Sequence, residues 1–189
     1  MSQTLSRRMT DDELLEWDLL QPDGRHELVD GAPVAMTGAH QRHDEVLYNV
    51  LMLIGRQLRG KPCRPFTAGG AVRIPAGGIR RPDVGVRCPA FDEAATCAAN
   101  PVLLVEILSP STRGVYLLLK ADEYRSIPSV RHLLTIEPDL PEVIIWSGLT
   151  GSNLLLRGLD AMVEVSDPEL RFSLGDIYEG LTFPPHLVS

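Results

Sequence analysis

The run of residues 102–108 constrains the fold more than any other feature of the chain. It reads Val-Leu-Leu-Val-Glu-Ile-Leu, an almost continuous apolar segment that contains one glutamate, Glu106. Such runs are typical of a central strand that other elements cover on both faces. A buried carboxylate is costly unless something compensates its charge. The run therefore predicts a layered α/β sheet, in which Glu106 either forms a structural ion pair with an arginine or serves a cation.

A second acidic residue, Asp83, follows Pro82 at the start of a short predicted strand, residues 83–87. Proline favours an extended conformation in the residue before it, and an aspartate at such a position either caps a turn or points into a cleft. Two carboxylates on neighbouring strands are a usual way to hold a hard divalent cation such as Mg²⁺. The pair of Asp83 and Glu106 thus points to metal-assisted hydrolysis of a phosphate ester.

Periodicity and turn residues predict the other elements of a mixed α/β sheet flanked by helices, with additional β-hairpins. We expect a helix that starts at the capping box of Thr10 and Glu13 and extends to about Leu20. The other expected elements are a hairpin (26–29 and 33–36), an amphipathic helix (40–58), an interrupted strand (65–74), a helix (114–126), a strand (130–137), a hairpin (143–146 and 153–157), a strand (163–165) and a short helix (174–178).

Composition limits the class of protein. The 189 residues are 44% apolar and 23% charged, a balance typical of one globular domain, and no internal repeat or linker divides them. The three cysteines are odd in number and lack a CxxC spacing, which argues against a disulfide framework and fits a reducing compartment. No segment is long and apolar enough to span a bilayer. We therefore expect a soluble cytoplasmic protein without a membrane partner.

Four residues stand out in order along the chain: Glu27, Asp83, Glu106 and Lys120. Their surroundings read HELVDG at 26–31, RPDV at 81–84, VEILSPST at 105–112, and a lysine followed four positions later by Tyr124. With this ordered series the chain resembles the PD-(D/E)XK nuclease superfamily, and within it a large bacterial family of restriction-endonuclease-like proteins. The resemblance covers residues 10–180 and implies a restriction-endonuclease-like fold for a single domain, 1–189.

The resemblance also implies roles for individual residues. Asp83 and Glu106 would be the principal ligands of Mg²⁺, or of Mn²⁺, with Glu27 completing or orienting the shell and the backbone carbonyl of Ile107 as a further ligand. The superfamily's lysine usually lies two positions after the glutamate, where this chain has a leucine, and this family instead takes it from the following helix. Lys120 would there orient or deprotonate the attacking water and stabilise charge on the phosphate.

DNA is the substrate that the resemblance implies, and His40, Arg73 and Arg81 are the expected substrate contacts. The formal net charge of -7 is unusual for a nucleic-acid-binding protein. The alternative is therefore a catalytically weak or inactive binding or structural protein of the same fold, which the apolar turn at 116–119 also favours. By analogy with such nucleases we expect a homodimer. His40 and His43 could also suggest zinc, but no further spaced ligands accompany them.

Overall fold

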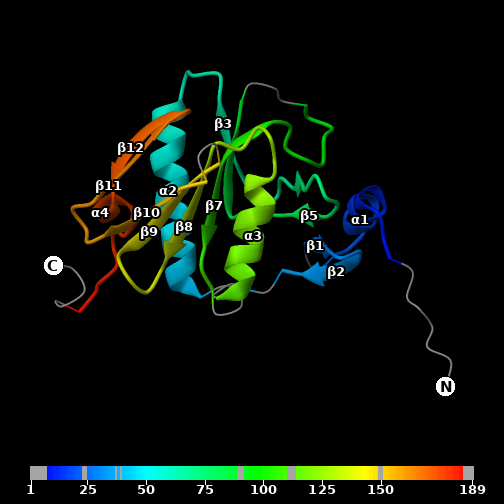
Figure 1. The fold of residues 1–189 in the computed structure, drawn as a ribbon, viewed down its shortest axis with the longest axis horizontal. Helices are drawn as coiled ribbons and strands as arrows, with labels where there is room; N and C mark the ends of the chain where they lie inside the picture. Colours follow the sequence, from blue (N-terminus) through cyan, green and yellow to red (C-terminus); the bar gives the residue numbers. More distant parts are fainter. Residues whose placement is uncertain are drawn as a thin grey trace.

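A six-stranded sheet forms the centre of the computed structural model, which describes residues 8–22, 25–36, 38, 40–88, 92–109, 114–148 and 151–184. Its strand order is β10-β9-β8-β7-β6-β3 (Figure 1). The strands are β3 (Arg64–Thr67), β6 (Val84–Arg87), β7 (Pro101–Ile107), β8 (His132–Glu137), β9 (Glu142–Ser147) and β10 (Asn153–Arg157). Only β7 and β8 pair in parallel among these strands, so the predicted mixed α/β architecture is confirmed.

Strand β7 is buried along its whole length between two helices. Helices α2 (Gln41–Leu58) and α3 (Val115–Arg125) cover opposite faces of the sheet (Figure 1). Because successive side chains of a strand point to opposite faces, Val105 and Ile107 pack in the α2 core, while Leu104 packs with residues of α3. The same alternation turns Glu106 toward α3. The expected central strand is thus confirmed, and its glutamate faces the helix that carries Lys120.

A second, smaller sheet packs beside the central one. Its order is β2-β1-β5-β4, formed by β1 (His26–Val29), β2 (Ala32–Ala35), β4 (Val72–Arg73) and β5 (Ile79–Arg80). Helix α1 (Asp11–Asp18) starts at the predicted capping box and buries Leu14 and Leu15 against this sheet. The hairpin of β1 and β2 is also as predicted.

The interpretation of residues 65–74 as one interrupted strand is wrong. Strand β3 pairs with β6 in the central sheet, whereas β4 pairs with β5 in the smaller sheet. A tight turn separates them, because the N–H of Gly70 donates to the carbonyl of Thr67 at 2.7 Å. The chain therefore passes from one sheet to the other within a few residues, and β5 had no recognisable strand pattern of its own.

The C-terminal part folds back on α2. It comprises a hairpin of β11 (Met162–Ser166) and β12 (Glu169–Ser173), followed by helix α4 (Leu174–Ile177). Ser173 caps the N-terminus of α4. The amide of Asn49, buried on α2, donates to the carbonyls of Ile177 and Glu179, both at 3.0 Å. Of this unit, the sequence predicted β11 and the short helix but not β12.

Cys63 and Cys88 form a disulfide, which contradicts the expectation of unpaired cysteines. The strand register explains the pairing: Arg64 lies opposite Arg87 in the antiparallel pair of β3 and β6, so the residues just outside that pair are neighbours. Their Cα atoms are 4.4 Å apart although 25 positions separate them in the sequence. The argument for a reducing compartment from cysteine spacing therefore fails. Among the described helices, none is both long and apolar enough to cross a membrane.

Candidate active site

The carboxylate of Asp83 lies at the end of the central sheet, next to β7. Val84 pairs with Val105 in the antiparallel register of β6 and β7, so the residue before β6 meets the last residues of β7. The N–H of Ile107 donates to Asp83 Oδ2 at 2.8 Å. Strand pairing thus brings the two predicted acidic residues, Asp83 and Glu106, to the same edge of the sheet.

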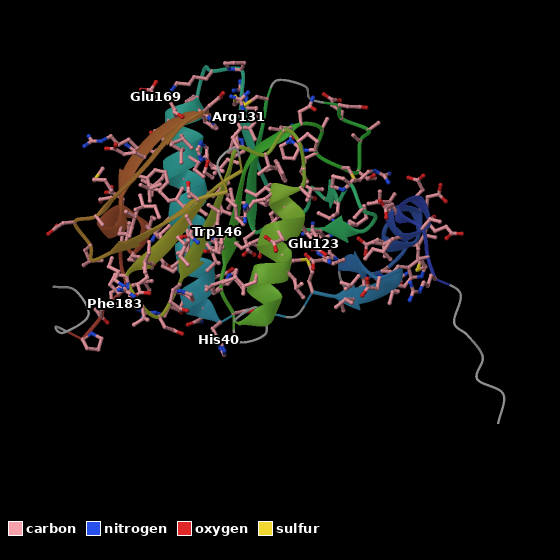
Figure 2. All side chains as sticks on the ribbon, viewed as in Figure 1. His40, Glu123, Arg131, Trp146, Glu169 and Phe183 are labelled. Carbon is pink, nitrogen blue, oxygen red and sulfur yellow. A yellow bond between two sulfur atoms is a disulfide. The ribbon has the colours of Figure 1, made fainter. Side chains whose placement is uncertain are left out.

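Lys120 joins this edge to the smaller sheet. Its Nζ lies 3.0 Å from Oε1 of Glu106 and 3.0 Å from Oε1 of Glu27, which is on β1. Taken singly, Lys120 and Glu27 would pass as surface residues, but the side chains of both are only 7% exposed. A second ion pair also fastens α3 to the smaller sheet, because Arg80 binds Glu123, which Figure 2 labels on α3. Helix α3 therefore carries Lys120 to a fixed position between two acids.

Tyr124 completes the contacts of Glu106. Its hydroxyl donates to Glu106 Oε1 at 2.5 Å, and its side chain is fully buried. It was noted in the sequence only as part of the family pattern and was not assigned to the site. Residues four apart on a helix lie on the same face, so its spacing from Lys120 is the signal that could have placed it there.

Glu27, Asp83, Glu106, Lys120 and Tyr124 are called the carboxylate cluster below. The pKa values in this cluster are set by burial and by an excess of acidic residues. Burial raises the pKa of Glu106 to about 7; Asp83 and Glu27 add to the rise, while Lys120 and Tyr124 oppose it. Burial alone would lower the pKa of Lys120, but Glu106 and Glu27 raise it above its ordinary value, so the ammonium stays charged at neutral pH. Burial and the same acids raise the pKa of Tyr124, which keeps its hydroxyl a hydrogen-bond donor. The cluster therefore favours additional positive charge.

His43 approaches the cluster from α2 and was missed as a site residue. Its Nε2 lies 3.5 Å from Asp83 Oδ2. Burial lowers the pKa of His43, but the hydrogen bond and the charge of Asp83, with Asp44 and Glu106, more than offset this and raise it. His43 thus contacts Asp83, and no group of three His, Cys, Asp or Glu side chains among the described residues supports a zinc site with His40.

The donor set fits a hard divalent cation. Asp83 accepts hydrogen bonds through Oδ2, and Glu106 accepts them through Oε1. No described residue donates a hydrogen bond to the other oxygen of either carboxylate. Within the described ranges, no three His, Cys, Asp or Glu side chains group as a metal site. Mg²⁺ needs only one or two carboxylates because it retains several waters. Asp83 and Glu106 could therefore hold Mg²⁺, whereas the contribution of the Ile107 carbonyl stays a prediction.

The three expected substrate contacts lie in different settings. Arg81 is buried: its guanidinium donates to Asp18 and to the carbonyls of His26, Ala68 and Gly69, while its backbone N–H donates to Glu27 Oε1 at 3.0 Å. Protein acceptors therefore occupy the donors of the Arg81 guanidinium group.

Arg73 and His40 are more accessible. Arg73 pairs with Asp11 and Asp12 of α1, so part of its charge is compensated within the protein. His40 is the N-cap residue of α2 and is exposed at that end of the helix (Figure 2). Its side chain makes no capping hydrogen bond. The structure thus leaves His40 open to a ligand and does not bring Arg73 into contact with the carboxylate cluster.

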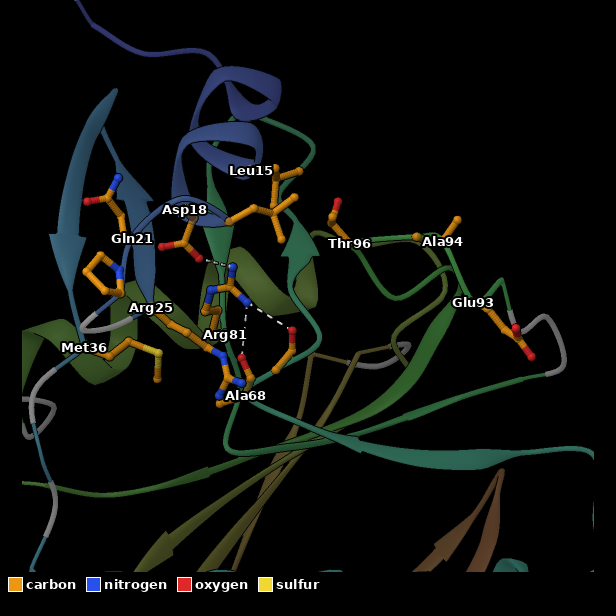
Figure 3. Close-up of a pocket in the computed structure, with 14 residues that line it drawn as sticks. Leu15, Asp18, Gln21, Arg25, Met36, Ala68, Arg81, Glu93, Ala94 and Thr96 are labelled. Carbon is orange, nitrogen blue, oxygen red and sulfur yellow. Dashed lines mark hydrogen bonds and ion pairs between the residues drawn. The ribbon is translucent and has the colours of Figure 1, made fainter.

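Arg81, whose backbone N–H donates to Glu27, also lines a cavity of about 860 Å³. Figure 3 shows this cavity. Its walls come from α1, from the chain around the β1–β2 hairpin, from residues 68–69 and from residues 93–96. Arg25 also lines it and forms no ion pair with any described residue, in contrast to Arg81, which binds Asp18 (Figure 3). Sequence reasoning did not single out Arg25.

Comparisons with known proteins agree with this fold. The family model Uma2, described as "Putative restriction endonuclease", matches residues 11–175. An uncharacterized protein of Synechocystis, slr1290, is 27% identical over 180 residues, which cover 93% of this chain and 94% of that protein. The crystal structure of a "putative nuclease belonging to DUF820" from Anabaena variabilis matches with a TM-score of 0.73 and 20% identity, covering 90% of this chain and 97% of that one. The chain therefore belongs to the Uma2 family, described as "Putative restriction endonuclease", and shares the fold of the Anabaena variabilis protein.

Proposed function

We propose that the protein is a Mg²⁺-dependent endonuclease that hydrolyses DNA phosphodiester bonds, with Mn²⁺ as a possible substitute. The observation that carries this proposal is the buried Lys120 ammonium, held 3.0 Å from both Glu27 and Glu106, beside the carboxylate of Asp83. Three acids share one lysine there, so a cation is the simplest compensation for the remaining charge. In a family of nucleases this arrangement favours phosphate chemistry.

The roles of the residues follow from their contacts. When bound, the cation would neutralise phosphate charge and lower the pKa of the attacking water. Asp83 and Glu106 would hold it, and Glu27 would complete or orient the shell. Of the two roles expected for Lys120, its raised pKa favours electrostatic stabilisation over proton abstraction, because an ammonium cannot act as a base. Tyr124 keeps Glu106 in place by its hydrogen bond.

DNA binding is the part of the proposal that needs positive charge at the surface. Arg25 lines the cavity beside Arg81 without an acidic partner in the described chain, and His40 is exposed at the end of α2. We assign these two side chains, rather than Arg81, to contacts with the phosphates of the substrate. Arg73 would contribute only if the substrate displaced Asp11 and Asp12.

Cleavage of supercoiled plasmid DNA tests the proposal. The wild-type protein should nick or linearise the plasmid with Mg²⁺ or Mn²⁺ and not with EDTA. Asp83→Asn and Glu106→Gln should abolish cleavage, while Asp122→Asn, on the exposed side of α3, should retain it as the matched control. The proposal fails if the wild-type protein leaves DNA intact with both metals, or if Asp83→Asn cleaves as well as the wild type.

The exposed apolar side of α3 favours a second candidate function, a homodimeric binding or structural protein. Leu118 and Leu119 are 55% and 57% exposed, next to the helix turn that bears Lys120. Exposed apolar pairs of this kind are typical of protein interfaces. Light scattering coupled to gel filtration should then report a dimer that Leu118→Glu dissociates. A monomeric wild-type protein would exclude this function, and a dimer with DNA cleavage would combine both.

A further inference from the structure

The imidazole of His43 has an unusual environment for a residue at the start of a helix. It lies in the first turn of α2, the helix that covers the face of the sheet opposite to α3 (Figure 1). Its side chain is only 12% exposed, and its Nε2 points to Oδ2 of Asp83 at 3.5 Å. The other ring nitrogen, Nδ1, is buried and finds no hydrogen-bond partner in the described part of the chain.

Packing alone does not account for a histidine at this position. A buried polar atom without a hydrogen-bond partner destabilises the folded protein. The positions that follow His43 on the same face of α2, Val46 and Val50, are fully buried and apolar. An aliphatic side chain at position 43 would continue this stripe and remove the unpartnered nitrogen. A group that is retained at such a cost calls for a role outside the core.

The role is visible in the contacts of Asp83. Oδ2 of this carboxylate is approached from two directions, by the N–H of Ile107 from β7 and by His43 from α2. The hydrogen bond from Ile107 and the nearby imidazole of His43, 3.5 Å away, together restrain the direction of this carboxylate. The second oxygen, Oδ1, accepts no hydrogen bond from any described residue and is left for a ligand.

We propose that His43 is a positioning residue that acts through Asp83: it holds Oδ2 so that Oδ1 is presented to the divalent cation. This inference deepens the proposed function and rests on it, because it assigns an orienting partner to one of the proposed ligands. Hydrogen-bonded partners of ligating carboxylates typically change metal affinity by about 10–100-fold when they are removed.

Binding of Mn²⁺ alone, without DNA, tests the proposal by calorimetry or electron paramagnetic resonance. His43→Leu should weaken Mn²⁺ binding about 10–100-fold. Without metal, the free energy of unfolding of His43→Leu in urea should equal or exceed that of the wild type, because the unpartnered nitrogen is gone. His43→Gln should recover most of the affinity, because its amide N–H can still donate to Asp83.

His132→Leu is the matched control. His132 also has a buried Nδ1 without a partner among the described residues, but it lies on β8 opposite Leu103, three positions before the residue that pairs with Glu106. Its removal should leave Mn²⁺ affinity unchanged. This variant separates the loss of a buried imidazole in general from the loss of the one beside Asp83.

Each of four results would overturn the inference. If His43→Leu binds Mn²⁺ as tightly as the wild type while Asp83→Asn binds none, His43 has no positioning role and the proposed function stands. If His43→Gln stays as weak as His43→Leu, or if His43→Leu is markedly less stable, the residue acts through structure and not through a donated hydrogen bond. If the wild-type protein binds no Mn²⁺, the proposed function fails together with the inference.

Discussion

Replacement of Lys120 by methionine should destabilise the protein by about 3–5 kcal/mol at pH 8, because it leaves buried carboxylates without their cation. The magnitude follows from the two contacts. Unit charges 3.0 Å apart attract each other by about 5–6 kcal/mol at an effective dielectric constant of about 20. The cost of removing the ammonium from water offsets much of this gain, but methionine restores none of the charge compensation for Glu27 and Glu106.

The effect should depend on pH in a defined direction. Lys120 lowers the pKa of Glu106, so its loss moves that pKa further above about 7. At pH 5 the folded variant can therefore carry a protonated Glu106, and the destabilisation should be much smaller than at pH 8. Urea unfolding followed by circular dichroism, at both pH values and without metal, measures the two differences.

Lys61→Met provides the control, because Lys61 is the only other lysine of the chain and is exposed at the end of α2. Its replacement should change stability by no more than about 0.5 kcal/mol. Lys120 does not compensate these carboxylates if Lys120→Met lowers the free energy of unfolding no more than Lys61→Met, or by the same amount at pH 5 and pH 8.

Three further predictions concern the same region and the disulfide. Tyr124→Phe removes a hydrogen bond to a buried carboxylate and should lower the free energy of unfolding in urea by about 1.5–3 kcal/mol. A decrease smaller than that of a typical surface substitution would show that this hydrogen bond is not formed. Reduction of the Cys63–Cys88 disulfide, or the double serine variant, should lower stability by about 3 kcal/mol, and unchanged unfolding after reduction would show that the bond is not formed. Because the pKa of Glu106 is raised from 4.5 to about 7, its contribution to stability is present at low pH and is lost as the pH rises through about 7. Mn²⁺ binding should accordingly release close to one proton at pH 6 and almost none above pH 8. Calorimetry at pH 6 in two buffers of different ionisation enthalpy measures this release. Equal binding enthalpies in the two buffers would show that Glu106 is not involved.

Local patterns were sufficient for the elements that carry the site. The apolar run of β7, the stripe of α2 and the turn between β1 and β2 each depend on neighbouring residues, so period and turn chemistry predicted them. The acids Asp83 and Glu106 could be placed near one another because strands that follow in sequence commonly pair in space. The position of Lys120 came from the resemblance to a family and not from its local sequence, which is that of a surface helix.

Contacts between distant segments were not predictable from the sequence. The pair of Lys120 and Glu27 links two sheets, and the disulfide of Cys63 and Cys88 depends on the register of β3 and β6. Arg81 likewise has no local feature that marks it as buried, since its acceptors come from α1, β1 and the turn after β3. Such interactions are set by tertiary packing, which single-residue propensities do not encode.

The position of a bound Mn²⁺ ion would show whether Asp83 and Glu106 form a metal site. Crystals of the wild-type protein soaked in Mn²⁺ and measured near the manganese absorption edge would locate the ion by its anomalous scattering. We expect a peak within about 2.0–2.6 Å of carboxylate oxygens of both Asp83 and Glu106, on the side away from Lys120. A peak elsewhere, or no peak at saturating Mn²⁺, would contradict a metal-dependent nuclease site at this edge of the sheet.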